Sequence, residues 1–102
     1  MRIITRKRLR EFAELYPDTA EPLQKWDRLV REAEWEGIQD VRRVYPHADA
    51  VTVASGNTVT VFNIGGNKYR LVAAIHYNRQ RVYVLGLLTH ADYSKGFWKD
   101  NL

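Results

Sequence analysis

Apolar residues in the first part of the chain recur with the period of a helix. Leu9, Phe12, Ala13 and Tyr16 are spaced at i, i+3, i+4 and i+7, which places them on one face of a helix. Pro17 lacks an amide hydrogen and is expected to end this helix. Before the helix, residues 2–5 are predicted to form a short strand.

A second helix is predicted after Pro17. Its apolar stripe consists of Leu23, Trp26, Val30 and Ala33. Thr19 is placed to cap its start, Pro22 lies in the first turn where a missing N–H is harmless, and Gly37 is expected to end it. One or two further helical turns are predicted from Ile38, Val41 and Tyr45.

From residue 50 the pattern changes to the two-residue period of strands. The predicted strands are rich in Val, Thr, Tyr and Ile and cover residues 50–54, 58–64, 68–77 and 81–88. The joints between them are three-residue segments, too short for crossovers, so the strands form an antiparallel meander. A short C-terminal helix follows, with Tyr93, Phe97 and Trp98 as core contacts. The sequence therefore predicts one α+β domain over residues 1–102, in which N-terminal helices pack on a small antiparallel sheet and a short C-terminal helix follows. All its helices are expected on one face of the sheet.

Composition narrows the function classes. The 102 residues carry 16 Lys and Arg against 12 Asp and Glu, for a net charge of +4, which favours a polyanionic partner. Between residues 51 and 99 the only acid is Asp92, so the strand region is locally basic. The chain has no cysteine, and its three histidines are scattered, so a zinc site, a disulfide framework and a cofactor are not expected. No apolar run is long enough for a membrane span or a signal peptide, and the cytoplasm is the expected location.

The residues best suited to chemistry lie at the ends of two predicted strands. Strand alternation directs Lys68 and Arg70 to the same face. If residues 78–80 form a three-residue loop, the register sets Arg70 opposite Leu88 and Lys68 opposite His90, and the three side chains form a compact triangle. A two-residue loop would reverse the parity and separate them.

Such a triangle suits RNA cleavage in which the 2′-hydroxyl is the nucleophile and no metal is required. Arg70 can hold the phosphate with its planar guanidinium, and Lys68 can act as a second cation. Histidine changes charge nearest neutral pH, so His90 can serve as general acid or base. Tyr93 can stack on a base or transfer a proton, and Asn67 and Lys95 are further candidates for RNA contact.

Each of these residues also has a structural interpretation. Lys68 and Arg70 can be solvated surface residues at a strand start, and His90 can simply begin the last helix. Tyr93 can be a core contact rather than a stacking platform. His76, in mid-strand, is expected to be structural, and His47 is expected in an exposed loop.

A family resemblance extends over nearly the whole chain. The run VFNIGGNKYRLVAAIHY from Val61 and the following RVYVLGLLTHADYSK from Arg81, with the opening RIITRKRLREFAELYP, resemble the HigB toxins of the RelE superfamily. The resemblance implies a RelE-like fold and ribosome-dependent, metal-independent cleavage of messenger RNA through a 2′,3′-cyclic phosphate. It also implies a HigA-like antitoxin with a helix-turn-helix domain as partner. The wider group carries tyrosine-arginine-leucine-valine, which Tyr69 to Val72 match, but has an arginine where this chain has His90.

Two alternatives to an endoribonuclease remain at this point. The same basic face would serve a non-catalytic module that binds RNA or the ribosome. It would also serve a protein-interaction domain with an acidic partner.

Overall fold

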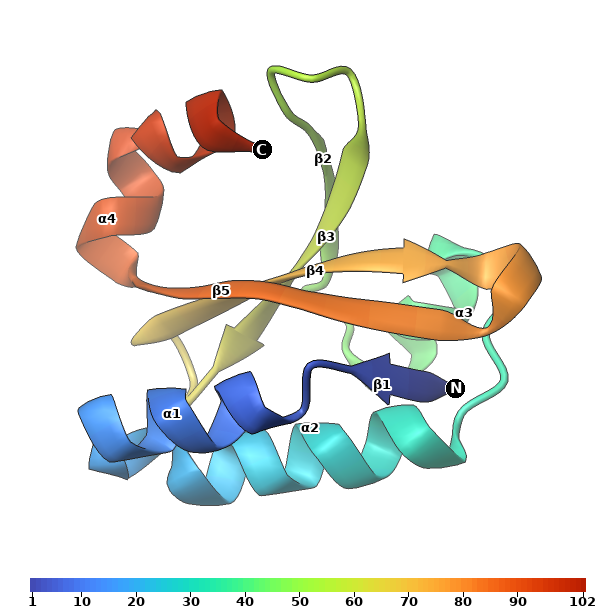
Figure 1. Cartoon of the computed structure of the whole chain (residues 1–102), viewed down its shortest axis with the longest axis horizontal. Helices are drawn as coiled ribbons and strands as arrows, with labels where there is room; N and C mark the ends of the chain where they lie inside the picture. The colour runs from blue at the N-terminus through green and yellow to red at the C-terminus, as the bar shows by residue number, and fades with distance from the viewer.

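The computed structural model describes residues 1–102 as helices around one five-stranded sheet (Figure 1). The helices are α1 (Lys7–Leu15), α2 (Ala20–Glu32), α3 (Ile38–Val44) and α4 (His90–Lys95), and the 3₁₀ turns are η1 (Pro17–Thr19), η2 (Tyr77–Arg79) and η3 (Phe97–Asn101). The strands are β1 (Arg2–Ile4), β2 (Asp49–Thr52), β3 (Thr58–Ile64), β4 (Tyr69–His76) and β5 (Arg81–Thr89). The α+β class predicted from the sequence is confirmed, and no helix is long and apolar enough to cross a membrane.

The sheet is mixed rather than wholly antiparallel. Its strand order is β1-β5-β4-β3-β2, and β2 to β5 form the predicted antiparallel meander. β1 pairs in parallel with β5, setting Arg2 beside Arg81 and Ile4 beside Tyr83. Hairpin turns force neighbouring strands to be antiparallel, but no turn joins β1 to β5, so the prediction of an antiparallel sheet does not hold at this edge.

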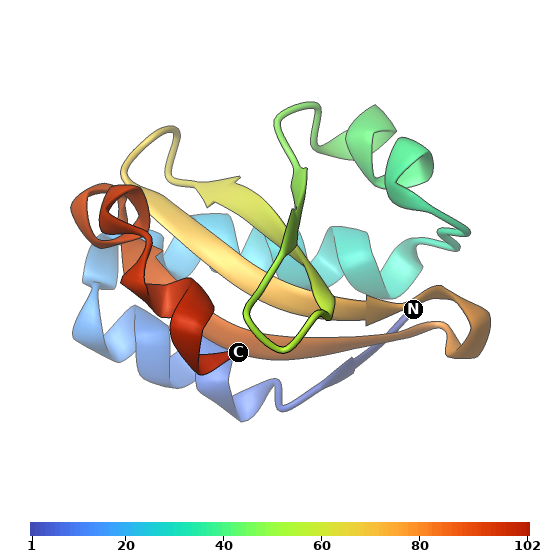
Figure 2. The same cartoon turned by 90° about the horizontal axis from the view of Figure 1, so that it is seen from above.

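Both faces of the sheet are covered. Alternation along β4 sends Leu71 and Ala73 into the main core, which α1 and α2 close from one side. Val72 points the other way, into a smaller cluster that α4 and η3 cover. Figure 2 shows this C-terminal segment crossing the sheet on the side opposite to α1 and α2. The expectation that all helices lie on one face was therefore wrong for α4, because the sheet has a second apolar face to bury.

The ends of α2 differ from the prediction. Thr19 precedes the helix as expected, but its hydroxyl donates to the Tyr16 carbonyl at 2.6 Å and makes no capping bond to α2. The helix ends at Glu32, not at Gly37, because Ala33 is already extended at φ −84° and ψ 152°. Gly37 instead precedes α3.

The β4–β5 hairpin reaches the predicted register by a different route. His76 pairs with Arg81, so the loop has four residues, 77–80, rather than three. A four-residue loop alone would reverse the parity, but a β-bulge at Val72/Ala73 leaves Leu85 as an extra residue in β5. The bulge restores the pairing of Arg70 with Leu88, which sets the geometry of the candidate site.

Candidate active site

Arg70 is the centre of the candidate site. It lies near the start of β4 and is only 8% exposed. Its Nη1 donates to the carbonyls of Asn67 and Tyr69 at 3.2 and 3.1 Å, and its Nη2 donates to Asn67 Oδ1 at 2.6 Å. A buried guanidinium needs such partners, because an unpaired buried charge is costly. The β3–β4 turn therefore holds Arg70 in a single orientation.

His90 lies beside Arg70. It is the first residue of α4, whose start is capped by the Thr89 side chain accepting from Asp92 N at 3.2 Å. The His90 backbone N–H donates to the Lys68 carbonyl at 2.9 Å, which continues the β4–β5 ladder by one residue. Arg70 Nη2 lies 3.3 Å from His90 Nδ1. Because a guanidinium can only donate, His90 Nδ1 is the acceptor of this contact. His90 is exposed, so a substrate can reach its ring.

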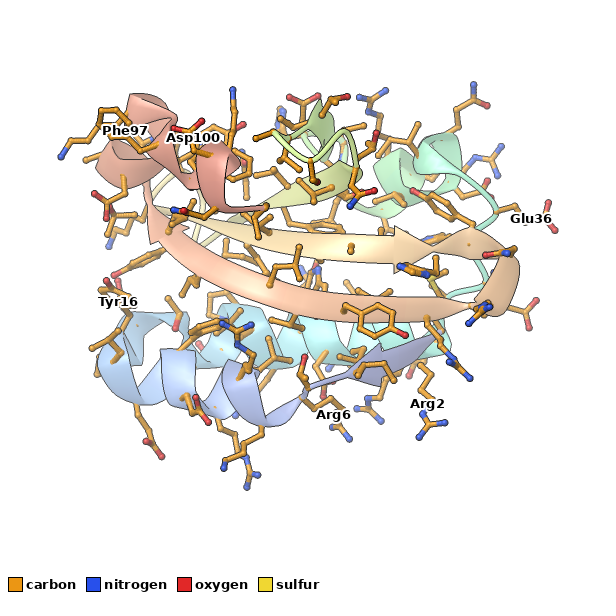
Figure 3. The ribbon with its side chains drawn as sticks, turned by 45° about the horizontal axis from the view of Figure 1, so that its top comes forward. Arg2, Arg6, Tyr16, Glu36, Phe97 and Asp100 are labelled. Carbon is orange, nitrogen blue, oxygen red and sulfur yellow. The ribbon has the colours of Figure 1, made fainter.

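Tyr93 forms a third side of the site. Its ring is stacked on Trp98 with centroids 5.4 Å apart and planes at 21°, and Arg70 Cζ lies 5.5 Å from the Tyr93 ring centre. Both aromatic rings pack against the smaller core cluster, as the structural interpretation expected. Phe97 was expected to do the same but is 72% exposed and points away from the sheet (Figure 3). Phe97 is the first residue of η3, and the chain changes direction just before it, at Gly96, which has a φ of +77°.

Lys68 is not part of the predicted triangle. Ile64 pairs with Tyr69, so Lys68 lies in the four-residue β3–β4 turn, where strand alternation does not set its direction. Its Nζ lies 3.8 Å from Asp18 Oδ2 in η1. The Tyr69 hydroxyl donates to the same carboxylate at 2.9 Å, and this hydrogen bond raises the pKa of Tyr69. The side chain of Lys68 therefore pairs with Asp18 and makes no hydrogen bond to Arg70 or His90.

The two predicted RNA contacts have different surroundings. Asn67 binds Arg70 twice, so within the protein it positions the guanidinium. Lys95 ends α4, is 63% exposed and lies 4.0 Å from Asp92. The structure thus gathers Asn67, Arg70, His90 and Tyr93, and leaves Lys68 and Lys95 at the margin.

Asp18 is the residue that the sequence analysis missed. Asp18 lies 51 positions from Tyr69 in the sequence, and only the tertiary fold brings its carboxylate to the Tyr69 hydroxyl on β4. Its one local signal is its place between Pro17 and Thr19 in the break between two helices, where the side chain is free to reach the sheet. The remaining histidines are as expected or outside the site: His47 is exposed, and His76 is exposed with its ring 4.9 Å from that of Tyr83.

The gathered groups are suited to chemistry on a phosphate. Arg70 offers a planar cation, His90 an exposed imidazole, and Tyr93 an aromatic face, all within one loop cluster. No three His, Asp or Glu side chains are grouped so that they could hold a metal ion. A basic domain that brings a cation, an imidazole and an aromatic ring together at neighbouring strand ends has the groups of a protein that acts on nucleic-acid phosphates.

Comparison with known proteins gives the family. The model of the HigB toxin, described as the RelE-like toxic component of a toxin–antitoxin system, matches residues 19–96. The mRNA interferase toxin HigB of Escherichia coli K12 is 29% identical over 93 residues, which cover 91% of this chain and 88% of the relative. The mRNA interferase HigB of Escherichia coli O6:H1 is 30% identical over 95 residues, covering 93% and 90%. The chain therefore belongs to the HigB family of RelE-like toxins, which confirms the resemblance seen in the sequence.

Proposed function

We propose that this chain is an endoribonuclease that cleaves messenger RNA as the toxin of a toxin–antitoxin pair. The family supports the toxin role, and the relatives from both Escherichia coli strains are named mRNA interferases. The observation that carries the proposal is the contact between Arg70 and the exposed His90, 3.3 Å apart at Nη2 and Nδ1. A phosphate bound there would meet a fixed cation and a group that can transfer a proton.

The proposed reaction uses the substrate's own 2′-hydroxyl. Its oxygen attacks the adjacent phosphorus, the bond from phosphorus to the 5′-oxygen breaks, and the products are a 2′,3′-cyclic phosphate and a 5′-hydroxyl. One proton leaves the 2′-oxygen and one is delivered to the 5′-oxygen. His90 performs one of these transfers, and a water molecule performs the other. Arg70 stabilises the extra negative charge that develops on the phosphate oxygens. These steps require proton transfer and charge stabilisation only, so the proposed reaction is metal-independent.

Asn67 has a specific part in this proposal. Its carbonyl and side-chain oxygen occupy one donor on each Arg70 nitrogen at 3.2 and 2.6 Å. A phosphate oxygen competes for the same donors and makes a stronger, charge-assisted bond. The Asn67 side chain therefore orients Arg70 before binding and yields Nη2 to the substrate.

Tyr93 is proposed to stack on a substrate base rather than to transfer a proton. Its ring is already held parallel to Trp98. A rigid aromatic face suits base stacking, which tolerates every base. Lys95, exposed at the end of the same helix, is proposed to contact the RNA backbone.

The family resemblance also suggests where the RNA is cleaved and which partner controls the toxin. We propose that cleavage occurs on messenger RNA in the ribosome, that a HigA-like helix-turn-helix antitoxin neutralises the toxin, and that both act in the cytoplasm. The net charge of +4 supports approach to ribosome-bound RNA by electrostatic attraction.

The experiment is cleavage of a defined messenger RNA with and without translating ribosomes, comparing wild type with Arg70→Ala. We expect cuts that need ribosomes, that persist in EDTA and that the variant loses. No cleavage by a folded wild type under either condition would overturn the proposal in favour of a binding module.

A further inference from the structure

A polar cleft leads away from the candidate active site around the β3–β4 turn. Asn67, which holds Arg70, also lines a cavity of about 570 Å³ together with Tyr45, His47, Asn63 and Gly66. Tyr45, Asn63 and Gly66 line a second cavity of about 570 Å³ on their other side. The two cavities share these residues and are therefore neighbours. We call them together the track, and Asn67 connects its first cavity to Arg70.

The far end of the track is lined by two cations that form no ion pair. Lys25 and Arg28 extend from α2 into the second cavity, and both are exposed. Neither forms an ion pair, whereas Arg31 on the same helix is paired with Asp27 at 3.4 Å. The only acid lining that cavity is Glu21. Unpaired lysine and arginine beside a polar cleft are the groups that bind phosphates.

The middle of the track offers free hydrogen-bonding groups. Asn63 faces Arg70 across the β3–β4 ladder, is half-buried and has no side-chain hydrogen bond in the protein. Tyr45 is half-buried edge-on against Phe62, and its hydroxyl also has no partner. Burial raises the pKa of Tyr45 to about 12 although Arg28 acts to lower it, so the hydroxyl stays protonated and able to donate. A carboxamide and a phenol of this kind suit a nucleotide's base edge and sugar.

We propose that this track binds the messenger strand next to the cut, with Lys25 and Arg28 contacting backbone phosphates and Asn63 and Tyr45 contacting the nucleotide between them and Arg70. Figure 2 shows the β3–β4 turn and the segment after α3 along the same side of the molecule, with α2 behind them. The ligand is single-stranded RNA, since most residues of the track present polar or cationic groups. Its apolar lining is limited to Pro22, Ile64, Pro46 and Ala48. The inference rests on the proposed cleavage activity and adds a binding site that the catalytic groups do not supply.

The test measures single-turnover cleavage of the messenger, on or off the ribosome as the wild type requires. The variant Lys25→Ala/Arg28→Ala is compared with Lys7→Ala/Arg10→Ala, which removes the same charge from the exposed α1–α2 groove. We expect the track variant to raise the concentration for half-maximal rate by about 5-fold, with the maximal rate unchanged, and the control to leave both unchanged. Losing two phosphate contacts should also reduce the salt dependence, by about 1.4 in the slope of log affinity against log salt.

Shortened messengers distinguish the messenger from other RNA. Trimming the messenger on one side of the cut should weaken binding by the wild type and leave the track variant unaffected. A loss of affinity in the variant that is independent of messenger length would place the contact on ribosomal RNA and overturn the proposal. A wild type that cleaves, with a track variant indistinguishable from the control, would refute this inference alone. A wild type that cleaves nothing would refute the proposed function.

Discussion

Replacing Arg70 by lysine keeps the positive charge but removes the planar guanidinium. Arg70 makes four contacts through two nitrogens, three with backbone or amide oxygens and one with His90 Nδ1. A lysine has one nitrogen, which cannot reach acceptors on both sides, and we expect it to keep about two of the four. At about 1 kcal/mol for each lost hydrogen bond, Arg70→Lys should lose about 2 kcal/mol of stability. For a domain of this size, that corresponds to a fall in Tm of about 8 °C.

The effect on cleavage should be larger than the effect on stability. A single ammonium cannot contact two phosphate oxygens at once, and removing such a donor from a transition state costs about 100-fold to 1000-fold in rate. The assay is single-turnover cleavage at a temperature where both proteins are folded by circular dichroism. Arg79→Lys is the matched control, because Arg79 is exposed in η2 with no hydrogen bond or ion pair of its side chain. A folded Arg70→Lys variant that cleaves within about 3-fold of wild type would refute the role given to the guanidinium.

Three further predictions test the surroundings of the site. Lys68→Ala should reduce the cleavage rate by less than about 3-fold, because the Lys68 side chain pairs with Asp18. A loss of about 100-fold would show that Lys68 is a catalytic residue. Tyr93→Phe should cleave RNA as the wild type does, because the Tyr93 hydroxyl donates no hydrogen bond, and an inactive Tyr93→Phe would indicate proton transfer by that hydroxyl. Tyr93→Leu removes the stacking on Trp98 and should lower the free energy of unfolding by about 1 kcal/mol. Tyr45 has its pKa raised to about 12 by burial, so the folded state holds this proton more tightly than the unfolded state. The stability it contributes is present below pH 10 and lost as the pH rises through 12. Chemical denaturation should show wild type losing about 1 kcal/mol more than Tyr45→Phe between pH 9 and pH 12, and parallel curves would contradict the cause assigned to the shift.

Periodicity predicted the elements whose faces are buried. Trp26 and Val30 on α2, and Leu71 on β4, are all fully buried, and their spacing alone placed them in a helix or a strand. The order of elements and the hairpin meander follow from such spacing and from short joints. The ends of helices depend on backbone conformation and cannot be predicted from spacing, as the end of α2 before Gly37 shows.

The position of Arg70 in the candidate site was predicted correctly, but from a wrong loop length. Arg70 lies opposite Leu88 as expected, although the loop is one residue longer than assumed. The bulge at Leu85 compensates for the longer loop. Gly86, inside β5 beside it, is the one local signal of such a bulge. The position of the Lys68 side chain could not be predicted either, because its partner Asp18 is brought near it only by the tertiary fold.

The most direct test of the account replaces a single 2′-hydroxyl. A messenger cut by the wild type is synthesised with 2′-deoxyribose at the nucleotide on the 5′ side of the mapped cut, and otherwise unchanged. If Arg70 and His90 assist attack by the substrate's own hydroxyl, this messenger should bind but not be cut there, and the all-ribose control should yield a 2′,3′-cyclic phosphate. Cleavage of the deoxy-substituted messenger at the same position and rate would contradict that mechanism.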